Sequence, residues 1–183
     1  LDVVFQPIVE VGSNDTRAME ALVRWNHPVL GDVSPVEFIP IAEKAGRVTD
    51  ITCFVLHRSM EIAQYWPSRV LLSVNLSTAD LATRSSVERI HQLLVQSPLS
   101  PRRVVFEITE SALMKDHQRG NSNLQLLRDL GVHVAVDDFG TGYSSLSYLS
   151  QLSIDRLKID RSFTDNIVED QQARKLLNGI FDL

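Results

Sequence analysis

Short apolar segments alternate with amphipathic segments along the whole chain, and this alternation predicts a repeated strand–helix fold. The strand segments are dominated by valine, isoleucine and leucine, as expected for strands that are buried on a parallel sheet. The segments predicted as strands are 3–9, 18–25, 70–76, 103–109, 133–138 and 156–160.

The segments between these strands carry helix-start signals and apolar residues at helical spacing. Ser34-Pro35-Val36-Glu37 combines a capping serine, a proline in the first turn and a glutamate three residues after the cap. Ser77-Thr78-Ala79-Asp80 is a weaker version of the same signal. The other predicted helices are 48–63, about 86–96, about 121–130 with Gly131 placed to end it, and one from about 170.

Repeated strand–helix units predict an α/β fold with a mostly parallel sheet. An open doubly wound sheet and a (β/α)₈ barrel both satisfy the pattern. The positions of Glu20, Asn75, Glu107 and the pair Asp137-Asp138 favour the barrel, because they lie within or at the ends of four separate strands. The carboxyl ends of barrel strands converge on one mouth, whereas an open sheet would spread these side chains along a line.

Composition restricts the partners of the chain. The 183 residues suit one domain, and a single cysteine excludes a disulfide framework. A net charge of −5 without a dense Lys/Arg run argues against binding DNA or long RNA. No signal peptide is visible, and no apolar run is long enough to cross a membrane. We therefore expect a cytoplasmic domain without membrane contact, in a parent protein that could itself be membrane-anchored.

The segment Val134-Ala135-Val136-Asp137-Asp138 ends a predicted strand in two adjacent carboxylates, and a glycine- and serine-rich loop follows it. Adjacent carboxylates repel each other and are costly to bury unless a cation or a proton compensates them. The pair therefore indicates either a metal site or a solvated turn that happens to carry two aspartates.

The other polar strand residues also have two interpretations each. Asn75 could cap the next helix, while Glu20 and Glu107 within strands need a partner for their charge. Lys158 either pairs with one carboxylate as a structural residue or lies among several as a functional one. Because the candidate ligands are all oxygen, with no histidine or cysteine at matching positions, they favour Mg²⁺ or Mn²⁺ over Zn²⁺.

Eight motifs, in order along nearly the whole chain, make it similar to the EAL domain of bacterial cyclic-di-GMP phosphodiesterases. The motif Glu20-Ala21-Leu22 is weak by itself, whereas the eight together are specific. The other motifs are Phe5-Gln6-Pro7-Ile8, His27-Pro28, Phe38-Ile39-Pro40, Val74-Asn75-Leu76-Ser77, Glu107-Ile108-Thr109-Glu110-Ser111, Asp137 to Ser145 and Leu157-Lys158-Ile159-Asp160.

The resemblance implies a modified TIM-type (β/α)₈ barrel whose first strand is antiparallel. It implies hydrolysis of cyclic di-GMP to linear pGpG with two Mg²⁺ or Mn²⁺ ions. Glu20, Asn75, Glu107 and Asp137 would hold one ion, and Asp137 would bridge to a second ion that Asp138 also binds.

The resemblance also implies roles for residues around the metals. Lys158 would contact the nucleophilic water, and Glu110 would anchor the loop that follows the two aspartates. Gln6 and Arg24 would contact the dinucleotide, with Leu22 packing nearby.

The family pattern expects two further strands, one of them carrying a glutamate for the second metal. We therefore expect residues 1–183 to be a single EAL domain that lacks its last two strands and is a weak or inactive enzyme alone. It would belong to a larger parent protein with fused sensor or signalling domains. The resemblance also implies a possible homodimer through Gly140 to about Leu152. The alternative function is a non-hydrolytic cyclic-di-GMP receptor of the same family.

Overall fold

The structure of the chain is a computed structural model that describes residues 1–109, 117–140 and 154–163. The main elements, in chain order, are β1 (Asp2–Val9), β2 (Thr16–His27), β3 (Gly31–Val33), α1 (Pro35–Lys44), α2 (Val48–Ala63), β4 (Leu71–Asn75), α3 (Thr78–Ala82), α4 (Arg84–Gln96), β5 (Val104–Thr109), α6 (His117–Arg128), β6 (His133–Phe139) and β7 (Arg156–Ile159). Short 3₁₀ turns, Pro101–Arg103 and Arg161–Phe163, precede β5 and follow β7.

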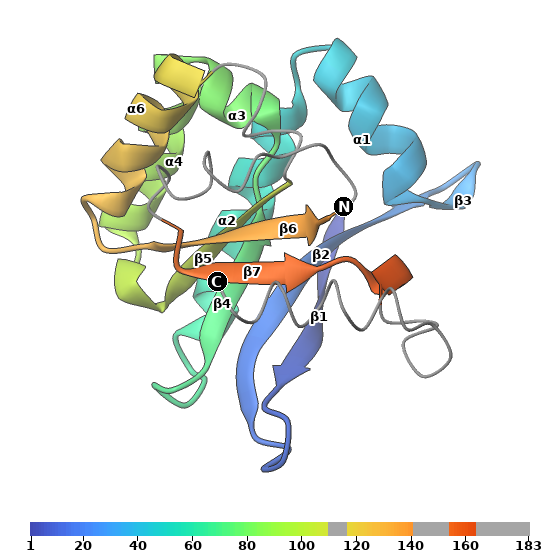
Figure 1. The fold of residues 1–183 in the computed structure, drawn as a ribbon. Helices are drawn as coiled ribbons and strands as arrows, with labels where there is room; N and C mark the ends of the chain where they lie inside the picture. The colour runs from blue at the N-terminus through green and yellow to red at the C-terminus, as the bar shows by residue number, and fades with distance from the viewer. Residues whose placement is uncertain (110–116, 141–153, 164–183) are drawn as a thin grey trace.

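One mixed sheet organises the molecule, with the strand order β1-β2-β4-β5-β6-β7 and β3 paired to β2 (Figure 1). β1 is antiparallel to β2, and every later neighbour from β2 to β7 is parallel. The antiparallel first strand and the six predicted strands are thus confirmed.

One face of the sheet packs against helices and forms the core. Alternate residues of β4 and β5, among them Leu72, Val74 and Phe106, join one buried cluster with the apolar faces of α2, α4 and α6. Leu56 of α2 and Ile90 of α4 have no exposed surface. The apolar positions predicted from the sequence therefore lie on this face of the sheet, where burial of apolar surface is the main contribution to folding stability.

The sheet is curled rather than open and flat. β4, β5 and β6 lie between β2 and β7, so a flat sheet would separate β2 from β7 by roughly 19 Å, too far for a lysine and a glutamate to bridge. Nevertheless, Nζ of Lys158 on β7 lies 3.4 Å from Oε2 of Glu20 on β2. The curl is that of a barrel wall, as predicted, although the sheet ends at β1 and β7 and does not close within the described residues.

Several local predictions need adjustment. The sequence did not predict the short strand β3, which pairs with the end of β2 through three residues. α6 begins at His117 rather than near 121 and includes Gly120, despite the low helix propensity of glycine. The weaker capping signal is confirmed, since Ser77 caps α3 together with Asp80. The helix predicted from about 170 lies outside the described residues.

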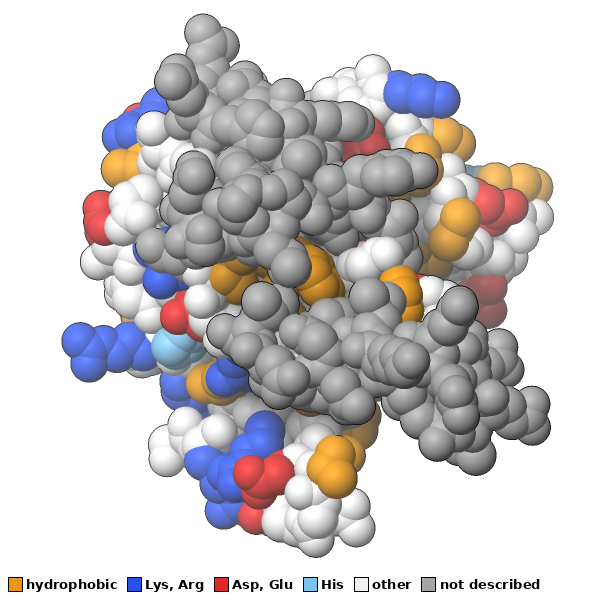
Figure 2. Space-filling model, in the orientation of Figure 1, with side chains coloured by type: hydrophobic (Ala, Val, Ile, Leu, Met, Phe, Trp, Pro, Cys, Tyr) orange, Lys and Arg blue, Asp and Glu red, His pale blue; other side chains and the backbone are white. Residues whose placement is uncertain are grey.

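Charged side chains of both signs lie on the described part of the surface. Where Figure 2 draws described residues, Lys and Arg side chains lie close to Asp and Glu side chains. Among the described residues, no helix combines the length and the apolar character that crossing a membrane requires.

Candidate metal and phosphodiester site

A cluster of three carboxylates and one ammonium lies at the carboxyl ends of the parallel strands. Nζ of Lys158 donates to Oε2 of Glu107 at 2.6 Å, to Oδ2 of Asp137 at 3.0 Å and to Oε2 of Glu20 at 3.4 Å. The four residues come from β7, β5, β6 and β2, so separate strands contribute each charge. Lys158 is therefore not the partner of a single carboxylate but lies among several.

Strand register explains why these side chains share one face. Asn75 pairs with Glu107, and Thr109, two residues beyond Glu107 on β5, pairs with Asp137. Residues in register on neighbouring strands, and residues two apart on one strand, point to the same side of the sheet. This is the face opposite the helices, on the concave side of the curl.

Asn75 extends the cluster instead of capping a helix. Its Nδ2 atom donates to Oε1 of Glu20 at 3.0 Å, while Ser77 is the cap of α3. The bond orients the Glu20 carboxylate, so that its other oxygen faces Lys158.

Glu107 is the most buried charge of the cluster, with 1% of its side chain exposed. Burial raises its pKa above the ordinary glutamate value, and hydrogen bonds from Lys158 and Ser73 oppose that rise. The Ser73 hydroxyl lies 2.6 Å from Oε1 of Glu107. Sequence reasoning missed Ser73, although it is the polar residue two positions before Asn75 on the same face of β4.

The cluster holds Lys158 in its charged form. Burial by itself would lower the pKa of Lys158, but the hydrogen bonds and charges of Glu107 and Asp137 outweigh it, and the pKa lies above the ordinary lysine value. Three negative groups thus converge on one positive group, which leaves an excess of negative charge.

Asp138 has a different environment from Asp137. Its side chain is exposed, and its backbone adopts φ +54°, with its N–H donating to Oδ1 of Asp137 at 3.0 Å. Partial loss of hydration is the larger cause that raises the pKa of Asp138, and repulsion from Asp137 is the second. Gly140, at φ +99°, lies so close to Phe163 that a Cβ atom would be 2.7 Å from its ring, so this position requires glycine.

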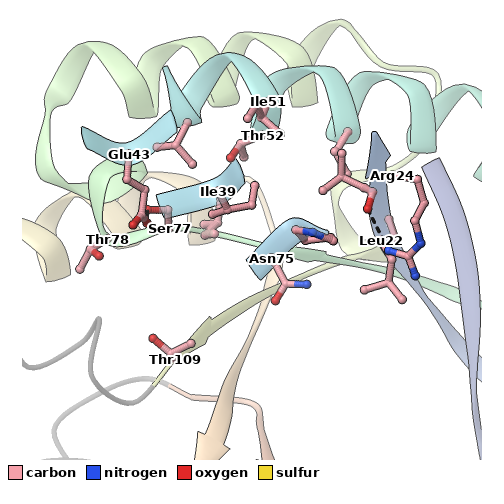
Figure 3. A pocket seen from close by; sticks show the side chains of 16 residues that line it. Leu22, Arg24, Ile39, Glu43, Ile51, Thr52, Asn75, Ser77, Thr78 and Thr109 are labelled. Atoms are coloured by element: carbon pink, nitrogen blue, oxygen red, sulfur yellow. Dashed lines mark hydrogen bonds between the residues drawn. The ribbon is translucent and has the colours of Figure 1, made fainter. Parts of the chain in front are cut away.

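A pocket of about 320 Å³ adjoins the cluster, between the end of β2, helices α1 and α2, and the turn after β4 (Figure 3). Leu22 and Arg24 line one end of it, and Asn75 and Thr109 lie on the side toward the cluster. Glu43 lies at the other end, where its Oε1 accepts from Oγ of Ser77 at 2.5 Å. Sequence reasoning missed Glu43, although Glu43 follows the Phe38-Ile39-Pro40 motif on α1.

The remaining predicted residues fall outside these contacts. Gln6 is exposed on β1 and pairs in register with Glu20, so it shares the face of the cluster without lining the pocket. Glu110, and most of the predicted dimer segment from Gly140 to Leu152, lie outside the described residues.

The chemistry of the donor set fits a divalent cation. Three carboxylates and one amide supply only oxygen ligands, the type that Mg²⁺ and Mn²⁺ prefer. Among the described residues, no three acidic, histidine or cysteine side chains already stand at metal-binding spacing. The ammonium explains this spacing, since N–H···O contacts of 2.6–3.4 Å hold the carboxylates farther apart than metal ligands would be.

Comparisons with known proteins identify the family of the chain. The family model described as "EAL domain" matches residues 1–183. An uncharacterized signaling protein of Caulobacter vibrioides is 41% identical over 183 residues, which is 100% of this chain and 23% of that protein. A cyclic di-GMP phosphodiesterase of Pseudomonas aeruginosa is 36% identical over 183 residues, covering 98% of this chain and 31% of that protein.

The fold of the chain is also similar to that of a solved phosphodiesterase structure. The PaMucR phosphodiesterase in its c-di-GMP complex has a TM-score of 0.89 and 34% identity, covering 98% of this chain and 74% of that one. The chain spans less than a third of the length of either curated relative.

Proposed function

This chain belongs to the EAL domain family, and we propose that it hydrolyses one phosphodiester bond of cyclic di-GMP to give linear pGpG. The observation that carries the proposal is the convergence of Glu20, Glu107 and Asp137 on Lys158 at the carboxyl ends of the strands. Active sites of barrel enzymes lie at this end. The phosphodiesterase relative and the nucleotide-bound neighbour named above support the choice of substrate.

The proposal assigns the carboxylates to divalent cations. Glu20, Asn75, Glu107 and Asp137 would hold one Mg²⁺ or Mn²⁺, and Asp137 and Asp138 would share in a second. Such ions lower the pKa of a bound water and neutralise charge on the phosphoryl oxygens. The excess negative charge of the cluster, already gathered around one ammonium, supports this assignment.

The chain's own residues supply binding and orientation. Arg24 and Leu22, which line the pocket beside the cluster, would hold the dinucleotide, together with Gln6 across the β1–β2 pair. Lys158 carries three N–H donors and no acceptor, so it would orient the attacking water and neutralise charge on the phosphate. Glu110 would steady the loop after the two aspartates.

The experiment is a product analysis with the full-length protein. We expect linear pGpG, separated by anion-exchange chromatography, when cyclic di-GMP is incubated with Mg²⁺ or Mn²⁺, and no product in a chelator. Tight binding without any linear product under every cation would overturn hydrolysis and identify a non-hydrolytic receptor.

The same proposal extends to the surroundings of the domain. Residues 1–183 would act as one EAL domain, fused to sensor or signalling domains in the cytoplasm and able to form a homodimer. The chain covers less than a third of the length of its curated relatives, and this supports the fusion. Light scattering of the full-length protein tests the dimer, and a monomer with full activity would contradict it.

A further inference from the structure

We propose that Ser73 is a positioning residue for Glu107: its hydroxyl holds one carboxylate oxygen and thereby presents the other to the cation. The inference rests on the proposed function, because it concerns how one assigned metal ligand acquires its orientation. Ser73 belongs to none of the motifs that connect the chain with its family.

The geometry divides the Glu107 carboxylate between two partners. Oγ of Ser73 lies 2.6 Å from Oε1, and Nζ of Lys158 lies 2.6 Å from Oε2. Ser73 has 1% of its surface exposed and Glu107 has 2%, so water has little access to either group. Each carboxylate oxygen therefore has one defined partner.

The direction of the bond follows from the chemistry of the two groups. An ionised carboxylate only accepts hydrogen bonds, so the Ser73 hydroxyl must donate. A distance of 2.6 Å is that of a charge-assisted O–H···O⁻ bond, the stronger class. The terminal torsion of a glutamate has broad preferences, so without this donor the carboxylate could rotate away from the cation.

Packing alone does not explain a serine at this position. The β4 residues on either side of it, Leu72 and Val74, belong to the helix-covered core, whereas Ser73 points to the concave face. An alanine would fill nearly the same volume there without the cost of burying a hydroxyl. The hydroxyl is compensated by the carboxylate that it orients.

Ser59 offers a matched control within the same protein. It lies on α2, has no exposed surface, and its buried hydroxyl makes no hydrogen bond in the described structure. Replacing either serine with alanine removes one buried hydroxyl, but only the Ser73 substitution removes a contact to a proposed metal ligand.

The test measures Mn²⁺ affinity of the full-length protein by calorimetry, without nucleotide. Ser73→Ala should weaken Mn²⁺ binding about 10- to 100-fold, the range for outer-shell partners of metal ligands. The Mg²⁺ concentration for half-maximal hydrolysis should rise by a similar factor, whereas kcat at saturating Mg²⁺ should change little. Ser59→Ala should leave both unchanged, and Ser73→Thr should restore most of the affinity because it keeps a hydroxyl donor.

The outcomes separate this inference from the proposed function. Unchanged Mn²⁺ affinity in Ser73→Ala, or an equal loss in Ser59→Ala, would overturn the positioning role while hydrolysis by the unaltered protein stands. An unaltered protein that neither binds Mn²⁺ nor forms pGpG would instead overturn the function itself. If Ser73→Ala does not fold, Ser73→Cys, similar in size but a weak donor, is expected to show the same loss of affinity, and normal affinity in that variant would contradict the inference.

Discussion

Strands β6 and β7 have a charged assembly at each end, and the two assemblies differ in their balance of charge. At the amino end, Oδ2 of Asp155 accepts from Arg128 at 2.9 Å and from the backbone N–H of Val134 at 2.8 Å. One carboxylate there has one guanidinium, and Nδ1 of His133 lies 3.8 Å from its other oxygen. At the carboxyl end, three carboxylates share the single ammonium of Lys158.

The comparison shows how a structural ion pair differs from a site that needs a ligand. The Asp155 assembly pairs its carboxylate with the Arg128 guanidinium and connects the beginning of β7 to β6. The Lys158 assembly has three carboxyl groups for one ammonium, an imbalance that a divalent cation would relieve. The contrast matches the general division in barrel enzymes between a stabilising amino face and a catalytic carboxyl face.

The largest expected effect is at Asp137. Asp137→Asn should lower kcat by about 10³-fold or more, because metal catalysis of phosphodiester hydrolysis supplies several kcal/mol of transition-state stabilisation. Chromatographic detection of pGpG measures the loss, and circular dichroism should show an unchanged fold. Activity that survives the substitution would show that Asp137 is not a metal ligand. The carboxyl-end assembly would then no longer differ from the Asp155 assembly in needing a cation at Asp137.

Lys158→Met should separate the catalytic role of the ammonium, which orients the nucleophile, from its structural role as the counterion of three carboxylates. As a group that orients the nucleophile, Lys158 should contribute about 10²- to 10⁴-fold to kcat. In a chelator the variant should also lose roughly 1–3 kcal/mol of stability, less than for a fully buried pair because the cluster is partly open to solvent. Denaturant unfolding with and without Mg²⁺ measures this loss of stability. If the variant in a chelator is as stable as the unaltered protein, Lys158 does not stabilise the fold as the counterion of the three carboxylates.

Adding Mg²⁺ should stabilise the protein through the carboxyl-end assembly alone. A cation that binds only the folded state adds about 2.7 kcal/mol at a concentration 100 times its dissociation constant. Thermal unfolding should show this shift in the unaltered protein and in Asp155→Asn, and a smaller shift in Asp137→Asn. An equal shift in all three proteins would locate the cation elsewhere.

The smallest effect should come from Asp155→Asn, which should cost about 1–2 kcal/mol of stability and leave kcat unchanged. Burial opposes ionisation of Asp155, but the Val134 N–H and Arg128 outweigh it, so its pKa in the folded state is lowered. Its stabilising contribution is therefore complete above the unfolded pKa of about 4 and is lost as pH falls through the lowered folded value.

Denaturant unfolding of both proteins between pH 7 and pH 2 checks this dependence. The stability difference between the unaltered protein and Asp155→Asn should shrink as pH falls below about 4 and through the lowered folded pKa of Asp155. A difference that persists at pH 2 would mean that packing, and not the ionised carboxylate, stabilises the strand start.

Much of the fold could be predicted because it follows from local patterns. Six strands, the capped start of α1 and the extent of α2 come from alternation, helical spacing and capping residues that neighbours in sequence determine. The short strand β3 could not be predicted from alternation, because it consists of only three residues that pair with the preceding end of β2. The early start of α6 could not be predicted either, because Gly120 has a low helix propensity.

Some residues of the candidate site could likewise be predicted from the sequence, and others could not. The sequence predicted that Glu20, Asn75, Glu107, Asp137 and Asp138 converge. The structure brings the first four together with Lys158, and the exposed Asp138 follows Asp137 at their edge. The sequence left open whether Asn75 capped a helix and whether Lys158 had one partner or several. Ser73 and Glu43 were not predicted, because a serine in a strand and a glutamate on a helix have no distinctive local signal.

The sequence by itself determined which residues alternate between the two faces of each strand, since side-chain direction in a strand depends only on position along the chain. It also determined the excess of acidic residues at the strand ends. Only the tertiary structure decided that β7 curls back toward β2, and thus that Lys158 meets Glu20 across four strand steps. The physical reason is that curvature accumulates over the whole sheet through twist and helix packing, and no single segment encodes it.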